Sequence, residues 1–419
     1  MSVTPPAGRG VGQGSGVTRW DIILIAFGAG MMASGHIGKL PAALPMIRGE
    51  LGLDLVTGGW IVSIFNAVSV ALGMLTGFFA DRLGHRRVVI GCLLLLAAGS
   101  LLGAVAESGL ALLAARFAEG IGFVGVVVSS PSIIAHAALP SDRRLALGLW
   151  GAFMPAGLAA MLLLAPLVLG LAGWRTLWQV VAGLTALWAV ITWLKLRHYQ
   201  PPSRPHQTGS GPTAAMGWRQ DLWLTLAQPG LWLLALSFGF YTLQWMALMV
   251  WLPTFLVEQR GASIALAAQL TVVVVLVNVI GNLLGGWLLQ RGRARWQLLT
   301  FVGFLSIGCG IGIFSDGVPD VARYALCIVF SGLAGMLPAT AMSGAPAFSP
   351  TPRQIGAANG LLVQGSNLGQ LLGPPAVAAA VALAGGWQAG SWIFVAAGVV
   401  GLGLAQALRH IERARTPHA

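Results

Sequence analysis

Apolar residues run along this chain in long stretches, each bounded by a short segment rich in charged residues, glycine or proline. A stretch of about 20 apolar residues has the length that an α-helix needs to cross roughly 30 Å of hydrocarbon. The pattern therefore predicts an all-α integral membrane protein with twelve transmembrane helices, over residues 20–47, 56–80, 86–106, 110–138, 145–171, 175–197, 230–256, 263–289, 297–315, 321–347, 355–385 and 391–408.

The segment 198–229 interrupts this pattern, because it carries the turn-forming residues Pro201, Pro202, Pro205 and Pro212 and is largely polar. Such a composition is typical of a linker. We expect it to join an N-terminal six-helix half (20–197) to a C-terminal six-helix half (230–408), with an N-terminal tail over 1–19 and a C-terminal tail over 409–419.

The two halves also resemble each other in sequence. Three glycines of the first half recur 212 residues later, and a tryptophan recurs 213 residues later: Gly148, Gly157, Gly173 and Trp174 correspond to Gly360, Gly369, Gly385 and Trp387. Internal repeats of this length indicate two parallel, pseudo-symmetric halves, which is a layout of transporters that rock around a central site.

The composition agrees with this reading, since 56% of the residues are hydrophobic, only 9% are charged and the mean hydropathy is +0.80. A soluble domain has about 25% charged residues. The net charge of +12 does not indicate nucleic-acid binding, because the basic residues are spread over short loops instead of one face. Eighteen of the 24 Lys and Arg lie on the side of the termini and four on the other side, so we expect both termini to be cytoplasmic.

The loop after the second predicted helix holds a glycine, an Asp-Arg pair, a second glycine and two more arginines. These are Gly77, Asp81, Arg82, Gly84, Arg86 and Arg87. A carboxylate in such a loop can cap a neighbouring helix and pair with arginines, so we expect a conformational latch here. The pattern resembles the loop motif of the major facilitator superfamily, and the resemblance extends from Trp20 to about Leu408. In the second half Gln290 stands in place of the aspartate.

Two further segments resemble superfamily patterns with departures. Glu119 stands where the motif of the fourth helix has glutamine, and Met154 precedes Pro155 where drug antiporters have glycine. The second departure weakens the resemblance to efflux pumps. Trp150, Pro155 and Gly157 are similar to the cyanate-permease-like branch of small-anion porters.

Few ionisable residues lie within the predicted helices, and such residues usually mark a transport path. His36 and Lys39 share one face of the first helix, and Arg116 and Glu119 share one face of the fourth. Arg116 and Glu119 can neutralise one another, whereas Lys39 has no acidic partner in its own helix. A positive cavity favours an anion, so we predict His36, Lys39 and Arg116 as substrate-binding residues; the alternative is that Lys39 reaches the membrane surface. We predict Glu119 for proton coupling, with a structural ion pair as the alternative.

The seventh predicted helix offers Tyr241, Gln244 and Trp245 as further substrate-binding residues. The resemblance implies that helices 1, 4, 7 and 10 line the central cavity. The chain holds no nucleotide-binding loop and no pattern typical of a catalytic or metal site, so we expect no enzyme, no cofactor and no metal.

We therefore predict a secondary active transporter of the inner membrane that moves a small organic or inorganic anion by proton-coupled alternating access, in symport. The partners would be the solute, the proton gradient and the lipid bilayer, and we expect a monomer. Two alternatives remain open, a proton-coupled multidrug efflux antiporter and a transporter-like sensor. An efflux pump would transport neutral or cationic amphiphiles, and a sensor would require a signalling partner.

Overall fold

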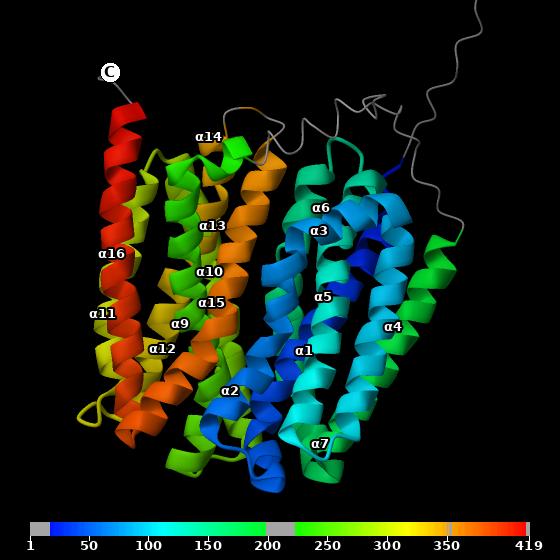
Figure 1. The fold of residues 1–419 in the computed structure, drawn as a ribbon, viewed down its shortest axis with the longest axis vertical. Coiled ribbons are helices and arrows are strands. Elements are labelled where there is room, and N and C mark those ends of the chain that lie inside the picture. Colours follow the sequence, from blue (N-terminus) through cyan, green and yellow to red (C-terminus); the bar gives the residue numbers. More distant parts are fainter. Residues whose placement is uncertain (1–16, 198–222, 350, 352–353, 416–419) are drawn as a thin grey trace, which may run out of the picture.

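The computed structural model describes residues 17–197, 223–349, 351 and 354–415 (Figure 1). Every regular element in these ranges is helical. The N-terminal half contains α1 (Trp20–Leu51), α2 (Leu55–Ser63), η1 (Ile64–Asn66), α3 (Ala67–Leu83), α4 (His85–Ala104), α5 (Gly109–Ala137), α6 (Arg143–Trp150) and α7 (Phe153–Leu196). The predicted N-terminal tail and linker fall largely outside the described residues, whereas residues 409–415 of the predicted C-terminal tail continue the last helix, which is therefore longer than predicted.

The C-terminal half repeats this arrangement. It contains α9 (Pro229–Arg260), α10 (Ile264–Gln290), α11 (Arg295–Phe314), α12 (Asp320–Ala334), α13 (Met336–Met342), α14 (Gly344–Phe348), α15 (Ile355–Ala384), η3 (Trp387–Ala389) and α16 (Gly390–Arg415).

Ten segments of the described chain have the length and composition of a membrane span, and Leu55–Ala71 forms a shorter apolar helix. One of the ten, Leu145–Leu196, holds two predicted helices. Its helix α7 bends at Gly173, whose φ of 76° and ψ of 179° are not helical. The long span thus divides there into two, which gives eleven, and Leu55–Ala71 belongs to the twelfth, predicted over 56–80, so the predicted total of twelve is confirmed.

Helices α2 and α10, which both begin at the end opposite the termini, have the same kind of N-terminal cap. Asp54 accepts a hydrogen bond from the Thr57 N–H at the start of α2, and Ser263 does the same for Leu266 at the start of α10. These side chains satisfy backbone donors that have no partner within the helix. Both follow a glycine in the left-handed region, Gly52 and Gly261. The two halves are therefore similar even in how these helices begin.

Packing within each half is also equivalent. Helix α1 packs along α7 as α9 packs along α15, and α4 packs along α7 as α11 packs along α16. Close approach depends on glycine at matched positions: a methyl group on Gly157 would collide with the Met31 carbonyl, and one on Gly369 with the Gly239 carbonyl. Small residues at such crossings are what membrane helices use to pack.

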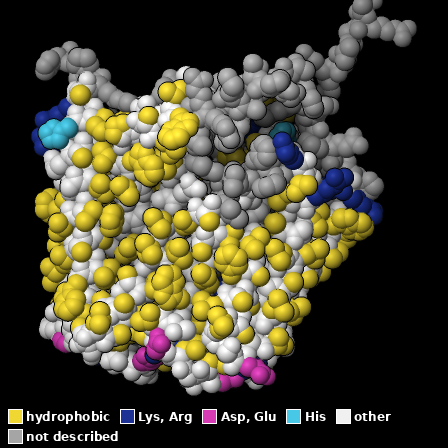
Figure 2. Space-filling model, viewed as in Figure 1, with side chains coloured by type: hydrophobic (Ala, Val, Ile, Leu, Met, Phe, Trp, Pro, Cys, Tyr) yellow, Lys and Arg dark blue, Asp and Glu magenta, His cyan; other side chains and the backbone are white. Residues whose placement is uncertain are grey.

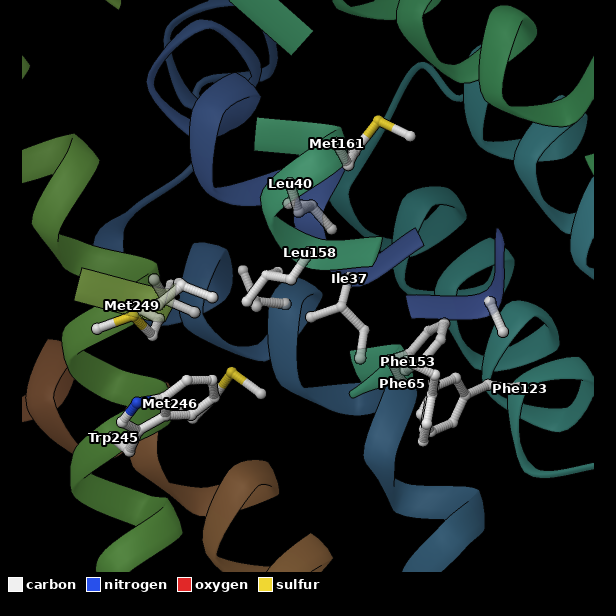
Figure 3. Packing of buried hydrophobic residues seen from close by; sticks show 14 of the residues in the cluster. Ile37, Leu40, Phe65, Phe123, Phe153, Leu158, Met161, Trp245, Met246 and Met249 are labelled. Atoms are coloured by element: carbon white, nitrogen blue, oxygen red, sulfur yellow. The ribbon is translucent and has the colours of Figure 1, made fainter. Parts of the chain in front are cut away.

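The two halves meet through apolar side chains and through contacts at one end. Figure 3 shows Ile37 and Leu40 of α1 beside Leu158 of α7, with Trp245 and Met249 on α9 across from them. The ends of α1 and α9 are joined by Arg48 and Glu258, whose Nη1 and Oε1 atoms are 2.8 Å apart. Both ends lie opposite the termini, so the halves are closed together there.

The surface has the character of a membrane protein. Figure 2 shows a broad hydrophobic band on the visible face, with Lys and Arg near the end that carries the termini and Asp and Glu at the opposite end. Large apolar side chains such as Leu171, Leu283 and Leu383 are more than two-thirds exposed. In hydrocarbon this exposure has no penalty.

Candidate functional site

Four ionisable side chains meet inside the N-terminal half. His36 and Lys39 come from α1, Arg116 and Glu119 come from α5, and all four are completely buried. The three-residue spacing puts both members of each pair on one face of their helix, and α1 and α5 present these faces to one another. We call these four residues the charged cluster.

Glu119 is the centre of the charged cluster. Its Oε1 atom accepts a hydrogen bond from Lys39 Nζ at 2.5 Å and lies 3.1 Å from His36 Nδ1. Its Oε2 atom accepts a hydrogen bond from Arg116 Nη1. With His36 neutral, the described cluster holds two cations and one carboxylate, and so it has an excess charge of +1.

The neighbouring helices satisfy much of the remaining hydrogen-bonding capacity. Lys39 Nζ donates to Ser100 Oγ of α4 at 2.8 Å and lies 4.5 Å from the Trp178 ring centroid. Arg116 donates to the carbonyl oxygens of His36 at 2.8 Å and of Ile61 at 3.3 Å. Its Nη2 atom has no hydrogen-bond partner among the described residues. The cluster therefore combines a charge excess with a buried donor that lacks an acceptor.

Arg116 is also held from the side by an aromatic pair. Its guanidinium carbon lies 4.5 Å from the centroid of the Phe65 ring. Figure 3 shows Phe65 beside Phe123, and their ring centroids are 4.8 Å apart. A cation over an aromatic face is stabilised by the ring quadrupole, and this stacking fixes the guanidinium plane.

The structure contradicts one point in each of the two interpretations of Lys39 that were made from the sequence. The side chain is not unpaired, because it contacts Glu119, and it does not reach the membrane surface, because its exposed fraction is 0%. The acidic partner lies on α5, 80 residues further along the chain. A search within one helix could not find it.

A cavity of about 410 Å³ lies between the two halves. The N-terminal half supplies the start of α7 and the residues before it, and the C-terminal half supplies most of the wall. The lining residues are Gly148, Gly151, Ala152, Met154, Pro155, Phe238, Tyr241, Thr242, Trp245, Asn278, Val279, Asn282, Leu283, Pro338, Ala339, Ser366 and Gln370. None of these described residues is charged. We call this space the central cavity.

Polar groups in the central cavity come from the C-terminal half. Tyr241 Oη accepts a hydrogen bond from Asn278 Nδ2 at 2.6 Å, and Trp245 Nε1 donates to Ser331 Oγ at 3.1 Å. Gln370 is 7% exposed, and its Oε1 atom has no hydrogen-bond partner among the described residues. The cavity can thus recognise a solute with an apolar body and a hydrogen-bond donor.

The structure separates the residues that the sequence grouped into one site. Tyr241 and Trp245 line the central cavity, whereas His36, Lys39 and Arg116 do not. Gln244 is turned toward α11 and α16, where it donates to the Phe394 carbonyl at 2.9 Å and accepts from Ser306 Oγ at 2.9 Å. The helices implied by the resemblance as cavity-lining therefore contribute unequally in this conformation.

Several cavity residues were not predicted. Asn278 and Asn282 lie four residues apart on α10, which puts both on one face of an otherwise apolar helix. This spacing was a usable signal, because amides are rare and costly in hydrocarbon. Ser366 was also not predicted; it lies four residues before Gln370 on α15.

The predicted latch is only partly described. Asp81 and Gly77 lie in α3, and their side-chain surroundings fall outside the described residues, so the latch stays a prediction. Gly84 has a φ of 88° between α3 and α4. Arg86 Nη1 donates to the carbonyl oxygens of Leu196 at 3.0 Å and Arg197 at 3.1 Å. A cation at a helix C-terminus is favourable, so Arg86 ties α4 to the end of α7.

The predicted latch contains two more arginines. Arg82 and Arg87 are exposed at the same end of the molecule. No group of three His, Cys, Asp or Glu side chains within the described ranges is placed to hold a metal ion.

Comparison with known proteins identifies the fold and the family. The family model of the Major Facilitator Superfamily matches residues 22–354. The chain belongs to this superfamily. The superfamily consists of solute carriers and not of enzymes, so the predictions of a transporter with many membrane-spanning helices and of no enzymatic activity are confirmed.

Individual superfamily members are similar at a lower level. The 3-(3-hydroxy-phenyl)propionate transporter of Escherichia coli (strain K12) is 28% identical over 356 residues, covering 80% of this chain and 84% of that protein. The probable sulfoacetate transporter of Cupriavidus necator is 25% identical over 263 residues, and the match covers 60% of each protein.

A solved structure shares the superfamily fold over nearly its whole length. The bacterial homologue of the human lysosomal transporter Spinster has a TM-score of 0.77 at 19% sequence identity, and the match covers 94% of this chain and 97% of that chain. At this identity the similarity establishes the fold alone.

Proposed function

We propose that this chain carries a small organic acid across the inner membrane by alternating access and couples this movement to protons. The observation that carries the proposal is the charged cluster, in which two buried cations surround one carboxylate. A buried excess charge is costly, and a bound anion reduces this cost. The unpartnered Nη2 of Arg116 supplies a donor for such an anion.

The central cavity supports the proposed transport of a small solute. Its volume of about 410 Å³ lies within the range of about 300 to 1,000 Å³ that is typical of small-molecule sites. Both halves contribute to its wall, and the Arg48–Glu258 contact closes the halves at the end opposite the termini. Movement of one half against the other would expose the cavity to the other side.

The distribution of charge supports the proposed orientation. The basic residues concentrate at the end that carries the termini, and the visible acidic residues lie at the opposite end (Figure 2). Positive loops remain cytoplasmic during insertion. We therefore propose that both termini are cytoplasmic and that the central cavity faces the cytoplasm in this conformation.

Two of the relatives support the proposed substrate class, because their names specify organic acids, sulfoacetate and 3-(3-hydroxy-phenyl)propionate. An acid of this kind has an anionic group together with a body that fits an uncharged cavity. In this proposal Tyr241, Trp245 and Asn278 contact the body of the solute, and the charged cluster supplies the attraction for its charge.

Uptake into proteoliposomes tests the proposal. Radiolabelled organic acids, including sulfoacetate and 3-(3-hydroxyphenyl)propionate, would be offered with and without a pH gradient. We expect at least one acid to accumulate only with the gradient, and a protonophore to abolish accumulation. If no acid of the panel accumulates in vesicles whose carrier is folded, the proposed substrate class is wrong.

A pair of lysine variants tests the role of the charge excess. Lys39→Gln removes one buried cation and with it the excess charge of the cluster, so we expect the anion to bind more weakly, because the attraction of that charge is lost. Lys195→Gln is the matched control, because Lys195 is exposed at the end of α7. Equal anion affinity in Lys39→Gln and the control would remove the main support for an anionic substrate.

Efflux of drug-like amphiphiles is the second candidate, and the absence of charged residues among the described lining of the central cavity favours it. A neutral or cationic amphiphile would need no buried cation. Accumulation of such a compound inside everted vesicles, unaffected by Lys39→Gln, would support efflux over uptake of an acid.

A further inference from the structure

We infer that His36 is the residue that takes up the transported proton, and that Glu119 stays ionised as its fixed counter-charge. This inference rests on the proposed proton coupling and assigns it to one side chain. From the sequence we predicted that Glu119 carries the proton and that His36 binds the substrate. The hydrogen-bond geometry of the charged cluster favours the opposite assignment.

Glu119 is poorly suited to accept the proton, because all of its contacts use its negative charge. Lys39 and His36 share Oε1, and Arg116 occupies Oε2. Protonation would leave two buried cations without an anion. Protonation of His36 gives the same excess charge of +2, but it keeps Glu119 as an anion in contact with all three cations. The second state retains every attraction, so it is the more favourable of the two.

His36 has a hydrogen-bond acceptor for each ring nitrogen. Its Nδ1 lies 3.1 Å from Glu119 Oε1, and its Nε2 lies 3.0 Å from Thr185 Oγ1. A protonated imidazole carries an N–H on both nitrogens. Both can be donated here without any movement of the ring.

Thr185 can serve either protonation state of His36. Its hydroxyl oxygen lies 2.8 Å from the Val181 carbonyl oxygen, to which it donates. In that orientation the oxygen accepts the Nε2 proton of a charged imidazole. When His36 is neutral with its proton on Nδ1, the hydroxyl rotates and donates to Nε2. The ring therefore gains or loses a proton while both of its nitrogens keep a hydrogen bond, and only the bond from Thr185 to the Val181 carbonyl is given up in the neutral state.

The groups that face His36 come from three helices, α1, α5 and α7. Lys39 lies on its own helix with Nζ 3.4 Å from Nδ1, Glu119 and Arg116 face it from α5, and Thr185 faces it from α7. Helix α4 contributes Ser100, which contacts Lys39 and not the ring. The two cations oppose protonation of His36, and Glu119 favours it.

This arrangement links the proton to the proposed solute. A proton on His36 raises the excess charge of the cluster from +1 to +2, which strengthens the attraction for an anion. A bound anion in turn offsets the repulsion between His36, Lys39 and Arg116. Each ligand thus favours the binding of the other, as linkage requires.

A cavity of about 90 Å³ adjoins Thr185. It lies between α1 and α7 and is lined by Thr185 together with Met31, Met32, Gly35, Gly157, Ala160, Met161, Leu164, Val181 and Leu184. Thr185 is thus the hydroxyl between this space and the imidazole.

Nitrogen NMR on the full chain in nanodiscs, with ¹⁵N-labelled imidazole rings, tests whether His36 takes up the proton. The pH is varied and no solute is added. His36→Gln identifies the His36 signals. We expect the His36 ring to pass from neutral to doubly protonated as the pH is lowered. A His36 ring that remains neutral over the whole pH range in which the protein stays folded would overturn the inference.

Two threonine variants of α7 give a matched comparison. Thr185→Val removes the acceptor of the Nε2 proton, and we expect the His36 midpoint to move to lower pH by about 0.5 to 1 unit, the equivalent of one hydrogen bond. Thr192→Val removes a buried hydroxyl that has no hydrogen-bond partner among the described residues, and it should leave the midpoint unchanged. An equal midpoint in both variants contradicts the role of Thr185.

Vesicle assays separate this inference from the function on which it rests. With 3-(3-hydroxyphenyl)propionate and sulfoacetate as probes, we expect His36→Gln to lose gradient-driven accumulation and to bind the acid with an affinity that no longer rises as the pH is lowered. Accumulation at the parent level in His36→Gln would overturn the assignment and leave the proposed function intact. Loss of gradient-driven accumulation in the parent protein itself would overturn the proposed function.

Discussion

Gly59 of α2 lies where the two halves touch at the end opposite the termini. A methyl group on this residue would lie 2.9 Å from Pro375 Cα, 3.0 Å from Pro375 N and 3.1 Å from the carbonyl carbon of Pro374. Carbon atoms prefer separations of about 3.5 to 4.0 Å. The colliding atoms belong to the backbone of α15 and cannot turn aside, so Gly59→Ala must push the halves apart.

The collision destabilises the conformation described here. Overpacking of a close contact costs about 1 to 3 kcal/mol, and a conformation in which the halves separate at this end avoids that cost. The population ratio should therefore shift by about 5- to 150-fold toward the separated conformation. Gly49→Ala is the matched control, because a methyl group there meets nothing within 4 Å.

Distances between spin labels measure this shift. Labels at Glu107 and Gly317 in a cysteine-free background report the separation of the two halves, because both positions are exposed in loops at this end. We expect Gly59→Ala to add or enlarge a longer-distance population, and Gly49→Ala to match the parent. A folded Gly59→Ala protein with the parent distance distribution would refute the reasoning.

Three further changes have expected outcomes. Asp81→Asn should slow turnover and leave solute binding intact, because it removes the charge of the predicted latch; equal turnover would discard the latch. The N–H of Thr57 holds the pKa of Asp54 below its ordinary value. The Asp54 carboxylate therefore stabilises the fold above pH ~4 and loses that contribution on acidification. The thermal stability of Asp54→Asn should fall less with acid than that of the parent protein. Glu119→Gln should lower stability by about 3 to 5 kcal/mol by leaving buried cations without an anion, and adding Lys39→Gln should restore part of it; thermal unfolding in detergent measures both.

Much of the fold could be predicted because its signals are local. Apolar runs of the right length, arginine-rich loops and glycines that repeat at a fixed offset each lie within short stretches of sequence. The connection at Gly173 was less visible, because a single residue with positive φ replaces a loop and lets α7 continue through it. Composition alone could not distinguish this bend from a longer turn.

The candidate site was predicted less well because it depends on contacts between distant helices. The sequence supplied Lys39 and Glu119 but not their contact, since the pairing requires the packing of α1 against α5. It also placed Gln244 with Tyr241 and Trp245, although Gln244 bonds to α11 and α16. Helical spacing shows which residues share a face and leaves open what that face contacts.

The charged cluster lies wholly in one half of the molecule, while the polar groups of the central cavity come from the other. This separation has a consequence for how such a carrier diversifies. Substitutions in α9, α10 and α15 can alter solute recognition without disturbing the buried charges of α1 and α5. A chimera that keeps residues 20–197 and takes its second half from a related carrier should therefore inherit the coupling of this chain and the solute preference of the donor.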